Sequence, residues 1–325
     1  MYTLDSIKEF LGGDWQAVQD GISSYLSTDI DLLRHINAGI LSHSGKQIRP
    51  VLSLLTARAC NGGRAGEDSI RCAVAAELLH NATLLHDDVA DEADVRRGEP
   101  TVRSLMGAST SVLIGDFWLV RAVRAVLDSE KNTKIISVFA STLSDLAEGE
   151  MLQLQKAETG DTVLKDYLDI IYRKTASLFV ATTVSAAHSV NAPENIGKAA
   201  EDFGKYLGLA FQMRDDIFDY MPSPDVGKAV GVDVMEKKIT LPLLCALDNV
   251  SESRQKEIRG MVCDIDAAGR DGILKFVREN GGIEGAQEVL DDYCSKALAA
   301  LDSFRGSEEK NMLEALVSIV SRRTR

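Results

Sequence analysis

Two short stretches of the sequence carry aspartates at the same unusual spacing, D-D-x-x-D. They are Asp87, Asp88 and Asp91 in the first stretch and Asp215, Asp216 and Asp219 in the second. Residues three and four apart share one face of a helix, so each copy directs at least two carboxylates the same way. Carboxylate oxygens are hard ligands that suit Mg²⁺, which commonly bridges them to phosphate oxygens. One copy alone could equally be a solvated helix end, but the recurrence favours a magnesium site.

Basic residues accompany both acidic stretches. They are Lys46, Arg49, Arg96, Arg97, Lys174, Lys228, Lys237 and Lys238. Lys174 lies in an apolar helical context, where a lysine is costly to bury without an anionic partner. Each of these residues taken singly could be an ordinary surface charge. Together they indicate binding of phosphate groups, with forked contacts from arginine and point charges from lysine.

The elements that must position these residues have the periodicity of helices. Apolar residues recur at spacings of three and four over residues 67–88, 109–127, 133–155, 164–190 and 196–220. We find no convincing alternating strand and no tight hairpin turn. Pro50, Pro100, Pro193, Pro222 and Pro242 lie where helices are expected to begin or end. The sequence therefore predicts an all-α protein in which each acidic motif closes a long apolar helix.

The composition narrows the class of protein. The chain has 325 residues, of which 45% are hydrophobic, and this is enough apolar content for a sizeable buried core. The net charge of −13 argues against a nucleic-acid partner. Five scattered cysteines and a start without a signal-peptide pattern suggest reduced thiols and a cytoplasmic location. The uncharged run from Thr175 to Pro193 is interrupted by polar residues, so we expect a buried helix and no integral membrane segment.

The order of the motifs resembles that of the trans-type polyprenyl diphosphate synthases. The matching stretches are G-K-x-x-R-P at 45–50, H-x-x-x-x-x-H-D-D-x-x-D-x-x-x-x-R-R-G at 80–98, K-T at 174–175, Q-x-x-D-D-x-x-D at 212–219, G-K at 227–228 and K-x-T-L-P at 238–242. They cover most of the chain, and the set is specific although no single element is. The departures are Lys237 and Ala229, which put local loop shape in doubt.

The resemblance implies a fold and two substrate sites. The fold would be one domain over residues 1–325, an antiparallel helical bundle around a central tunnel, usually in a homodimer. The allylic diphosphate would lie on Mg²⁺ held by the aspartates, with support from Arg96, Lys174, Lys228 and Lys238. Isopentenyl diphosphate would lie nearby without metal, on Lys46, Arg49, His80 and Arg97. Thr175 and Gln212 would lie beside the reacting carbons.

The chemistry agrees with this assignment. Breaking an allylic C–O bond expels diphosphate, and Mg²⁺ with cationic side chains stabilises the charge that develops. The allylic cation needs a dry pocket and dipoles that do not attack it, a role that suits Thr175 and Gln212. The released diphosphate can take the final proton, so no histidine or glutamate base is required. We therefore expect the catalytic residues to be Asp87, Asp88, Lys174, Thr175, Gln212 and Asp215.

Product length would depend on residues below the first motif. In this family the positions four and five before it act as a gate, here Thr83 and Ala82. Both are small, so the passage should continue past Leu79 toward a long product, such as a quinone side chain. Phe117 and Trp118 are candidates for its floor, and either could equally be ordinary core.

Three alternatives stay open at this point. A short-chain synthase would use the same motifs to make farnesyl or geranylgeranyl diphosphate. A terpene cyclase would share the first motif, but its second motif normally has a different pattern. A non-catalytic subunit of a heteromeric synthase would tend to lose acids, whereas all six are present here.

Overall fold

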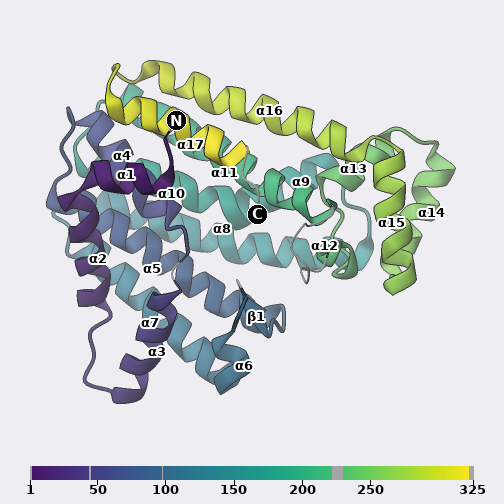
Figure 1. The fold of residues 1–325 in the computed structure, drawn as a ribbon, viewed down its shortest axis with the longest axis horizontal. Helices are drawn as coiled ribbons and strands as arrows, with labels where there is room; N and C mark the ends of the chain where they lie inside the picture. The colour runs from purple at the N-terminus through teal and green to yellow at the C-terminus, as the bar shows by residue number, and fades with distance from the viewer. Residues whose placement is uncertain (1, 44, 97, 222–229, 322–325) are drawn as a thin grey trace. The chain divides into compact units, whose positions relative to one another are not determined.

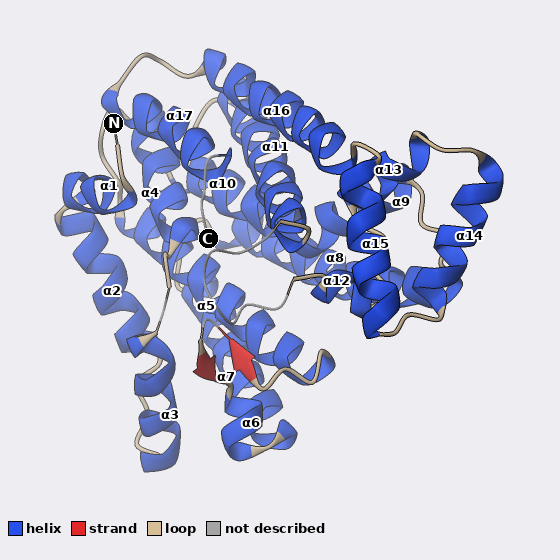
Figure 2. Cartoon of the chain, turned by 45° about the vertical axis from the view of Figure 1, so that its right-hand side comes forward, coloured by secondary structure: helices blue, strands red, loops and turns tan. Residues whose placement is uncertain are grey.

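A computed structural model describes residues 2–43, 45–96, 98–221 and 230–321. Helices make up most of these residues, with one pair of very short strands, as Figure 2 shows. The prediction of an all-α fold is confirmed. No helix in the described ranges is both long enough and apolar enough to cross a membrane.

The helices begin and end as follows. In the first half they are α1 (Leu4–Leu11), α2 (Gly13–Tyr25), α3 (Asp31–Ser42), α4 (Ile48–Cys60), α5 (Glu67–Ala90), α6 (Val102–Met106), α7 (Ala108–Leu127) and α8 (Asn132–Thr159). In the second half they are α9 (Leu164–Ile171), the π-helical turn η1 (Tyr172–Ala176), α10 (Ser177–Ser189), α11 (Glu194–Asp219), α12 (Val232–Met235), α13 (Leu241–Asp248), α14 (Glu252–Cys263), α15 (Ala267–Glu279), α16 (Gly282–Ala300), the 3₁₀ turn η2 (Leu301–Ser303) and α17 (Glu308–Ser321).

The chain divides into two compact units. The first comprises Met1–Ala140, Ala181–Glu201 and Ser303–Ala315, and the second comprises Ser141–Val180, Asp202–Asp302 and Leu316–Arg325. The boundaries fall inside α8, α10, α11, the 3₁₀ turn η2 and α17. The first acidic motif belongs to the first unit and the second motif to the second unit. That the whole chain is one domain stays a prediction.

Helix α5 is the central element of the first unit, and it packs against α2, α4 and α7 (Figure 1). All residues from Cys72 to Leu79 are buried. Small residues such as Ala73, Ala75 and Ala76 allow neighbours to approach α5 closely, and a helix that is buried on all sides belongs in a core. The first acidic motif therefore lies at the end of a helix whose middle is fully buried.

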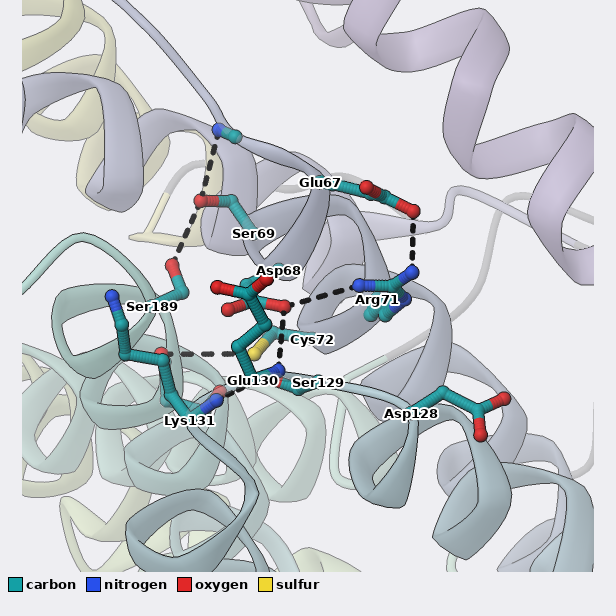
Figure 3. A network of polar contacts seen from close by, with 12 residues as sticks. Glu67, Asp68, Ser69, Arg71, Cys72, Asp128, Ser129, Glu130, Lys131 and Ser189 are labelled. Atoms are coloured by element: carbon teal, nitrogen blue, oxygen red, sulfur yellow. Dashed lines mark hydrogen bonds and ion pairs between the residues drawn. The ribbon is translucent and has the colours of Figure 1, made fainter.

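The opposite end of α5 is held by a network of polar contacts (Figure 3). The hydroxyl groups of Ser69 and Ser189 lie 2.8 Å apart. The Cys72 thiol lies 3.7 Å from the Ser185 carbonyl oxygen, and the Glu130 backbone N–H donates to Asp68 at 3.2 Å. These contacts join the start of α5 to the end of α10 and to the α7–α8 connection. They fix the axial position of the helix that carries the motif.

In the second unit, the predicted helix over residues 164–190 is interrupted. Helix α9 ends at Ile171, and the π-helical turn η1 separates it from α10. A π-helical turn is rare and often marks a functional position. Periodicity could not reveal it, because one extra residue in a single turn barely alters the apolar pattern.

A short hairpin also departs from the sequence prediction. Strands β1 (Val95–Arg96) and β2 (Glu99–Pro100) pair in antiparallel fashion. Gly98 has a φ of 84°, a backbone conformation that glycine adopts without steric cost. The prediction that the chain has no tight hairpin was wrong here, because strands of two residues are too short to show alternation.

Candidate active site

The three aspartates of the first motif have different surroundings. Asp88 is buried, and it accepts a hydrogen bond from Arg96 Nε at 2.5 Å. Asp87 is half-buried, whereas Asp91 is exposed and caps the C-terminus of α5. Strand β1 carries Arg96, so the hairpin brings this arginine to the motif. The structure thus joins two predicted site residues, Asp88 and Arg96, in an ion pair.

The aspartates of the second motif also differ in burial. Asp216 is buried and accepts hydrogen bonds from the Tyr167 hydroxyl at 2.7 Å and from Gln212 Nε2 at 2.8 Å. Burial raises the pKa of Asp216 to about 6, although these two hydrogen bonds act in the opposite direction. Asp215, by contrast, is half-buried.

Asp219 organises the segment that follows the motif. Its carboxylate accepts the backbone N–H groups of Val232 at 3.1 Å and Asp233 at 3.0 Å, at the start of α12. Its own carbonyl oxygen accepts the Gly231 N–H at 2.8 Å. Asp219 therefore supports the backbone that leads to Lys238, the side chain of which pairs with Glu236.

Lys174 and Thr175 both lie on the π-helical turn η1. The Lys174 ammonium group pairs with Glu150 of α8. The Thr175 hydroxyl donates to Gln212 Oε1 at 2.6 Å, so the structure brings these two predicted site residues together. The turn therefore presents a cation and a hydroxyl group from consecutive residues.

Two glycines allow the neighbouring helices to approach this turn. A Cβ atom on Gly208 of α11 would lie 2.6 Å from the Ala176 Cα atom. A Cβ atom on Gly149 of α8 would lie 2.7 Å from the Arg173 Cβ atom and 3.1 Å from the Lys174 backbone nitrogen. Real Cβ contacts are longer, so a side chain at either position would push its helix away from η1.

The residues predicted to bind isopentenyl diphosphate lie on α4, α5 and the segment before α4. Lys46 is exposed, whereas Arg49 and His80 are half-buried. Gly45 and Gln47 both have positive φ angles, 67° and 51°, so the backbone bends sharply around Lys46. Arg97 and Lys228 lie outside the described residues. The shared role of this group stays a prediction.

The predicted chain-length residues lie on α5, one to two turns before Asp87. Leu79 and Ala82 are each 1% exposed, whereas Thr83 is partly exposed and its hydroxyl donates to the His80 carbonyl oxygen at 2.8 Å. Of the two candidates for the tunnel floor, Trp118 is fully buried and donates from Nε1 to Asn37 at 2.9 Å. Phe117 lies under the Arg121 guanidinium group at 4.7 Å.

Sequence reasoning missed three residues around these motifs: Tyr167, Glu150 and Asp233. Tyr167 and Glu150 contact predicted site residues, and Asp233 lies beside Asp219. Burial raises the pKa of Asp233 well above its usual range, and the charges of Asp216 and Asp219 add to this effect. A buried tyrosine seven residues before a functional lysine carries no sequence signal that separates it from ordinary core.

The donor set suits a hard divalent cation, because every predicted metal ligand is a carboxylate. Within the described ranges, no three histidine, cysteine, aspartate or glutamate side chains are grouped so that they could hold a metal ion by themselves. Asp88, Asp216 and Asp219 are buried, and each accepts hydrogen bonds from protein groups. Phosphate oxygens of a substrate would therefore have to complete the coordination.

Comparisons with known proteins agree with the motifs. A family model described as polyprenyl synthetase matches residues 30–276. The octaprenyl diphosphate synthase of Haemophilus influenzae is 36% identical over 98% of this chain and 96% of its own length. The crystal structure of a decaprenyl diphosphate synthase from Rhodobacter capsulatus has a TM-score of 0.92 at 31% identity, and the match covers 99% of this chain and 100% of that one.

The structure of a third relative was solved with ligands bound. The polyprenyl synthase of Caulobacter crescentus was solved in complex with calcium and isoprenyl diphosphate. Its structure has a TM-score of 0.89 at 31% identity, and the match covers 99% of this chain and 98% of that one. The family model matches residues 30–276, and the relatives match nearly the whole sequence. This chain therefore belongs to the polyprenyl synthetase family.

Proposed function

We propose that this protein is a prenyltransferase that condenses isopentenyl diphosphate repeatedly, head to tail, with an allylic diphosphate such as farnesyl diphosphate. The product would be a long all-trans polyprenyl diphosphate, used for a quinone side chain. The observation that carries the proposal is the second motif, in which Gln212 connects Asp216 to the Thr175 hydroxyl. A hydroxyl and an amide oxygen beside a diphosphate site suit the stabilisation of an allylic cation. A cytoplasmic location remains a prediction.

The six aspartates differ in burial, and we propose that they differ in metal binding as well. We assign Asp87, Asp91 and Asp215 as the residues that would hold Mg²⁺, because their side chains are more exposed than those of Asp88, Asp216 and Asp219, which are buried. When bound, Mg²⁺ would neutralise the diphosphate that leaves the allylic carbon. This narrows the six-ligand prediction to three.

The cations of the chain would bind the diphosphate groups. Arg96 uses Nε on Asp88, which leaves its other guanidinium N–H groups to donate to phosphate oxygens. Lys174 would exchange Glu150 for the allylic diphosphate. Lys228 and Lys238 would assist there, and Lys46, Arg49, His80 and Arg97 would bind isopentenyl diphosphate.

The small residues at the gate support a long product. Ala82 and Thr83 offer little bulk on the helix below Asp87. The short-chain alternative would require a larger obstacle further along, for which Trp118 and Phe117 are the candidates. The octaprenyl name of the Haemophilus influenzae relative favours the long product.

One experiment separates the proposal from its alternatives. The purified chain is incubated with Mg²⁺, farnesyl diphosphate and labelled isopentenyl diphosphate, and the products are separated by chain length. Products longer than C20 support the proposal, and products that stop at C15–C20 would identify a short-chain synthase. A cyclase would release hydrocarbon from the allylic diphosphate alone, and a non-catalytic subunit would form no product.

We also propose that the protein forms a homodimer. Leu113, Val120 and Leu127 of α7 are 68%, 64% and 49% exposed. They follow one another at intervals of seven residues, so they lie along one face of the helix. Such a row of exposed apolar side chains suits pairing with the same row of a second copy.

A further inference from the structure

Tyr167 lies on α9 and takes no part in the motifs that define the proposed function. Its side chain is 2% exposed, and its hydroxyl donates to Asp216 Oδ2 at 2.7 Å. The other carboxylate oxygen of Asp216 accepts Gln212 Nε2 at 2.8 Å. Two donors on different elements, α9 and α11, therefore hold one buried carboxylate.

This arrangement fixes the orientation of the Gln212 amide. A carboxylate is an acceptor, so the nitrogen of the amide must face Asp216 and the oxygen must face Thr175. The Thr175 hydroxyl then donates to Gln212 Oε1 at 2.6 Å. A continuous chain of hydrogen bonds thus runs from Tyr167 through Asp216 and Gln212 to Thr175.

The direction of these bonds has a chemical consequence. The hydroxyl hydrogen of Thr175 and one amide hydrogen of Gln212 are both used within the chain. Oxygen lone pairs of both side chains remain for an electron-deficient group. A reversed amide would instead present N–H hydrogens, which repel positive charge. Dipoles fixed before the reaction stabilise a developing charge without having to reorganise.

We propose that Tyr167 and Asp216 are positioning residues, which hold the Gln212 amide and the Thr175 hydroxyl with their oxygen lone pairs available to the allylic cation. This inference rests on the proposed function, because it assumes an allylic cation beside Thr175. It assigns Asp216 a role in orientation and not in metal binding, and it gives Tyr167 a function through Asp216.

The test compares steady-state kinetics of the wild type, Tyr167→Phe and Tyr220→Phe. Tyr167→Phe removes one anchor of Asp216, and we expect kcat to fall about tenfold or more, as when a preorganised polar group is disturbed. KM for both diphosphates and the Mg²⁺ concentration for half-maximal rate should not change. Tyr220 is a matched control, because it is equally buried and its hydroxyl lies 3.2 Å from the Thr240 hydroxyl. We expect Tyr220→Phe to lower the thermal midpoint but not kcat.

A double-variant cycle with Gln212→Ala identifies the route of the effect. If Tyr167 acts through Gln212, the Tyr167→Phe change should add no further loss of kcat in the Gln212→Ala background. Effects that multiply fully would overturn the proposal. So would a raised Mg²⁺ requirement in Tyr167→Phe, because it would make Asp216 a metal ligand.

A second variant covers the case in which Tyr167→Phe does not fold. Asp216→Asn preserves the shape of the side chain but can donate to Gln212 Oε1 and reverse the amide. We expect it to lose kcat with an unchanged Mg²⁺ requirement, and retained kcat would overturn the proposal. If the wild type itself forms no elongated product, the proposed function fails, which is a distinct outcome.

Discussion

Residues at equivalent spacing in the two motifs have different partners. Asp88 pairs with Arg96 from a hairpin, Asp216 is held by Tyr167 from α9, and Asp219 accepts backbone N–H groups at the start of α12. The sequence predicted that each acidic motif closes a long helix, and this was correct. It could not predict that Tyr167 donates to Asp216 or that backbone N–H groups at the start of α12 donate to Asp219, because these donors lie outside the motifs.

The first prediction tests this division between Asp215 and Asp219. Asp215→Asn should lower kcat by about a hundredfold or more and raise the Mg²⁺ concentration for half-maximal rate, because it removes a charged oxygen from the proposed metal site. Asp219→Ala should instead lower the free energy of unfolding by about 0.5–2 kcal/mol, as expected for the loss of a helix cap. Titration of Mg²⁺ and thermal unfolding measure the two effects. An equal increase in the Mg²⁺ requirement in both variants would contradict the division.

The second prediction concerns His188 of α10 and the stability of the first unit in acid. Burial lowers the pKa of His188, and the positive charge of Lys134 lowers it further. A histidine whose pKa is lower in the folded state contributes stability above its unfolded pKa of about 6.5 and loses that contribution as the pH falls further. The thermal midpoint should therefore fall between pH 7 and pH 5.5. His188→Gln should reduce this slope, as measured by thermal unfolding at each pH.

At the scale of elements, the candidate site depends on how closely the helices pack as well as on their order in the chain. Sequence periodicity located the long helices α5, α7, α8 and α11, and it placed each acidic motif at a helix end. It did not locate the π-helical turn η1, which depends on packing against α8 and α11. Gly149 and Gly208 can be read from the sequence, but only the structure shows that they allow α8 and α11 to approach η1 closely.

The third prediction tests the contact between α11 and η1. Gly208→Ala places a Cβ atom 2.6 Å from the Ala176 backbone, so it should destabilise the protein by about 1–3 kcal/mol despite the higher helix propensity of alanine. It should also lower kcat, because Gln212 would shift relative to Thr175. Gly197→Ala is the control on the same helix: its Cβ atom would have no neighbour within 4 Å, and it should stabilise by about 0.5–1 kcal/mol. Chemical unfolding and product assays measure both.

The fourth prediction concerns the gate on α5. Thr83 lies about 6 Å and Ala82 about 7.5 Å before Asp87 along the helix. Thr83 is partly exposed, so Thr83→Phe should fold normally and shift the products to C15–C20. Ala82→Phe should shift them similarly but with a loss of stability of about 1–3 kcal/mol, because Ala82 is only 1% exposed. Chromatography of the products measures the chain length that each variant makes. An unchanged product distribution in both variants would remove the sequence support for a long product.

At the scale of the whole molecule, charge and apolar surface bear on partners. The net charge of −13 opposes the binding of anionic diphosphates, so the basic residues must act locally. The sequence predicted the all-α fold correctly, and the local role of the basic residues stays a prediction. It could not distinguish the exposed apolar residues of α7 from core residues, because periodicity marks an apolar face without identifying what covers it.

The fifth prediction tests whether a second copy covers this face. Leu113 is the most exposed of the three residues spaced by seven on α7, so Leu113→Asp should place an unpaired charge within the proposed contact. The wild type should sediment as a dimer of the 35.3 kDa chain, and the variant as a monomer with an unchanged helical circular dichroism spectrum. Leu298→Asp is the control, because Leu298 is a 40% exposed leucine on α16 and is not one of the α7 residues of the proposed contact. A wild type that sediments as a monomer would contradict the homodimer. A Leu113→Asp variant that remains dimeric would instead place the contact on another surface.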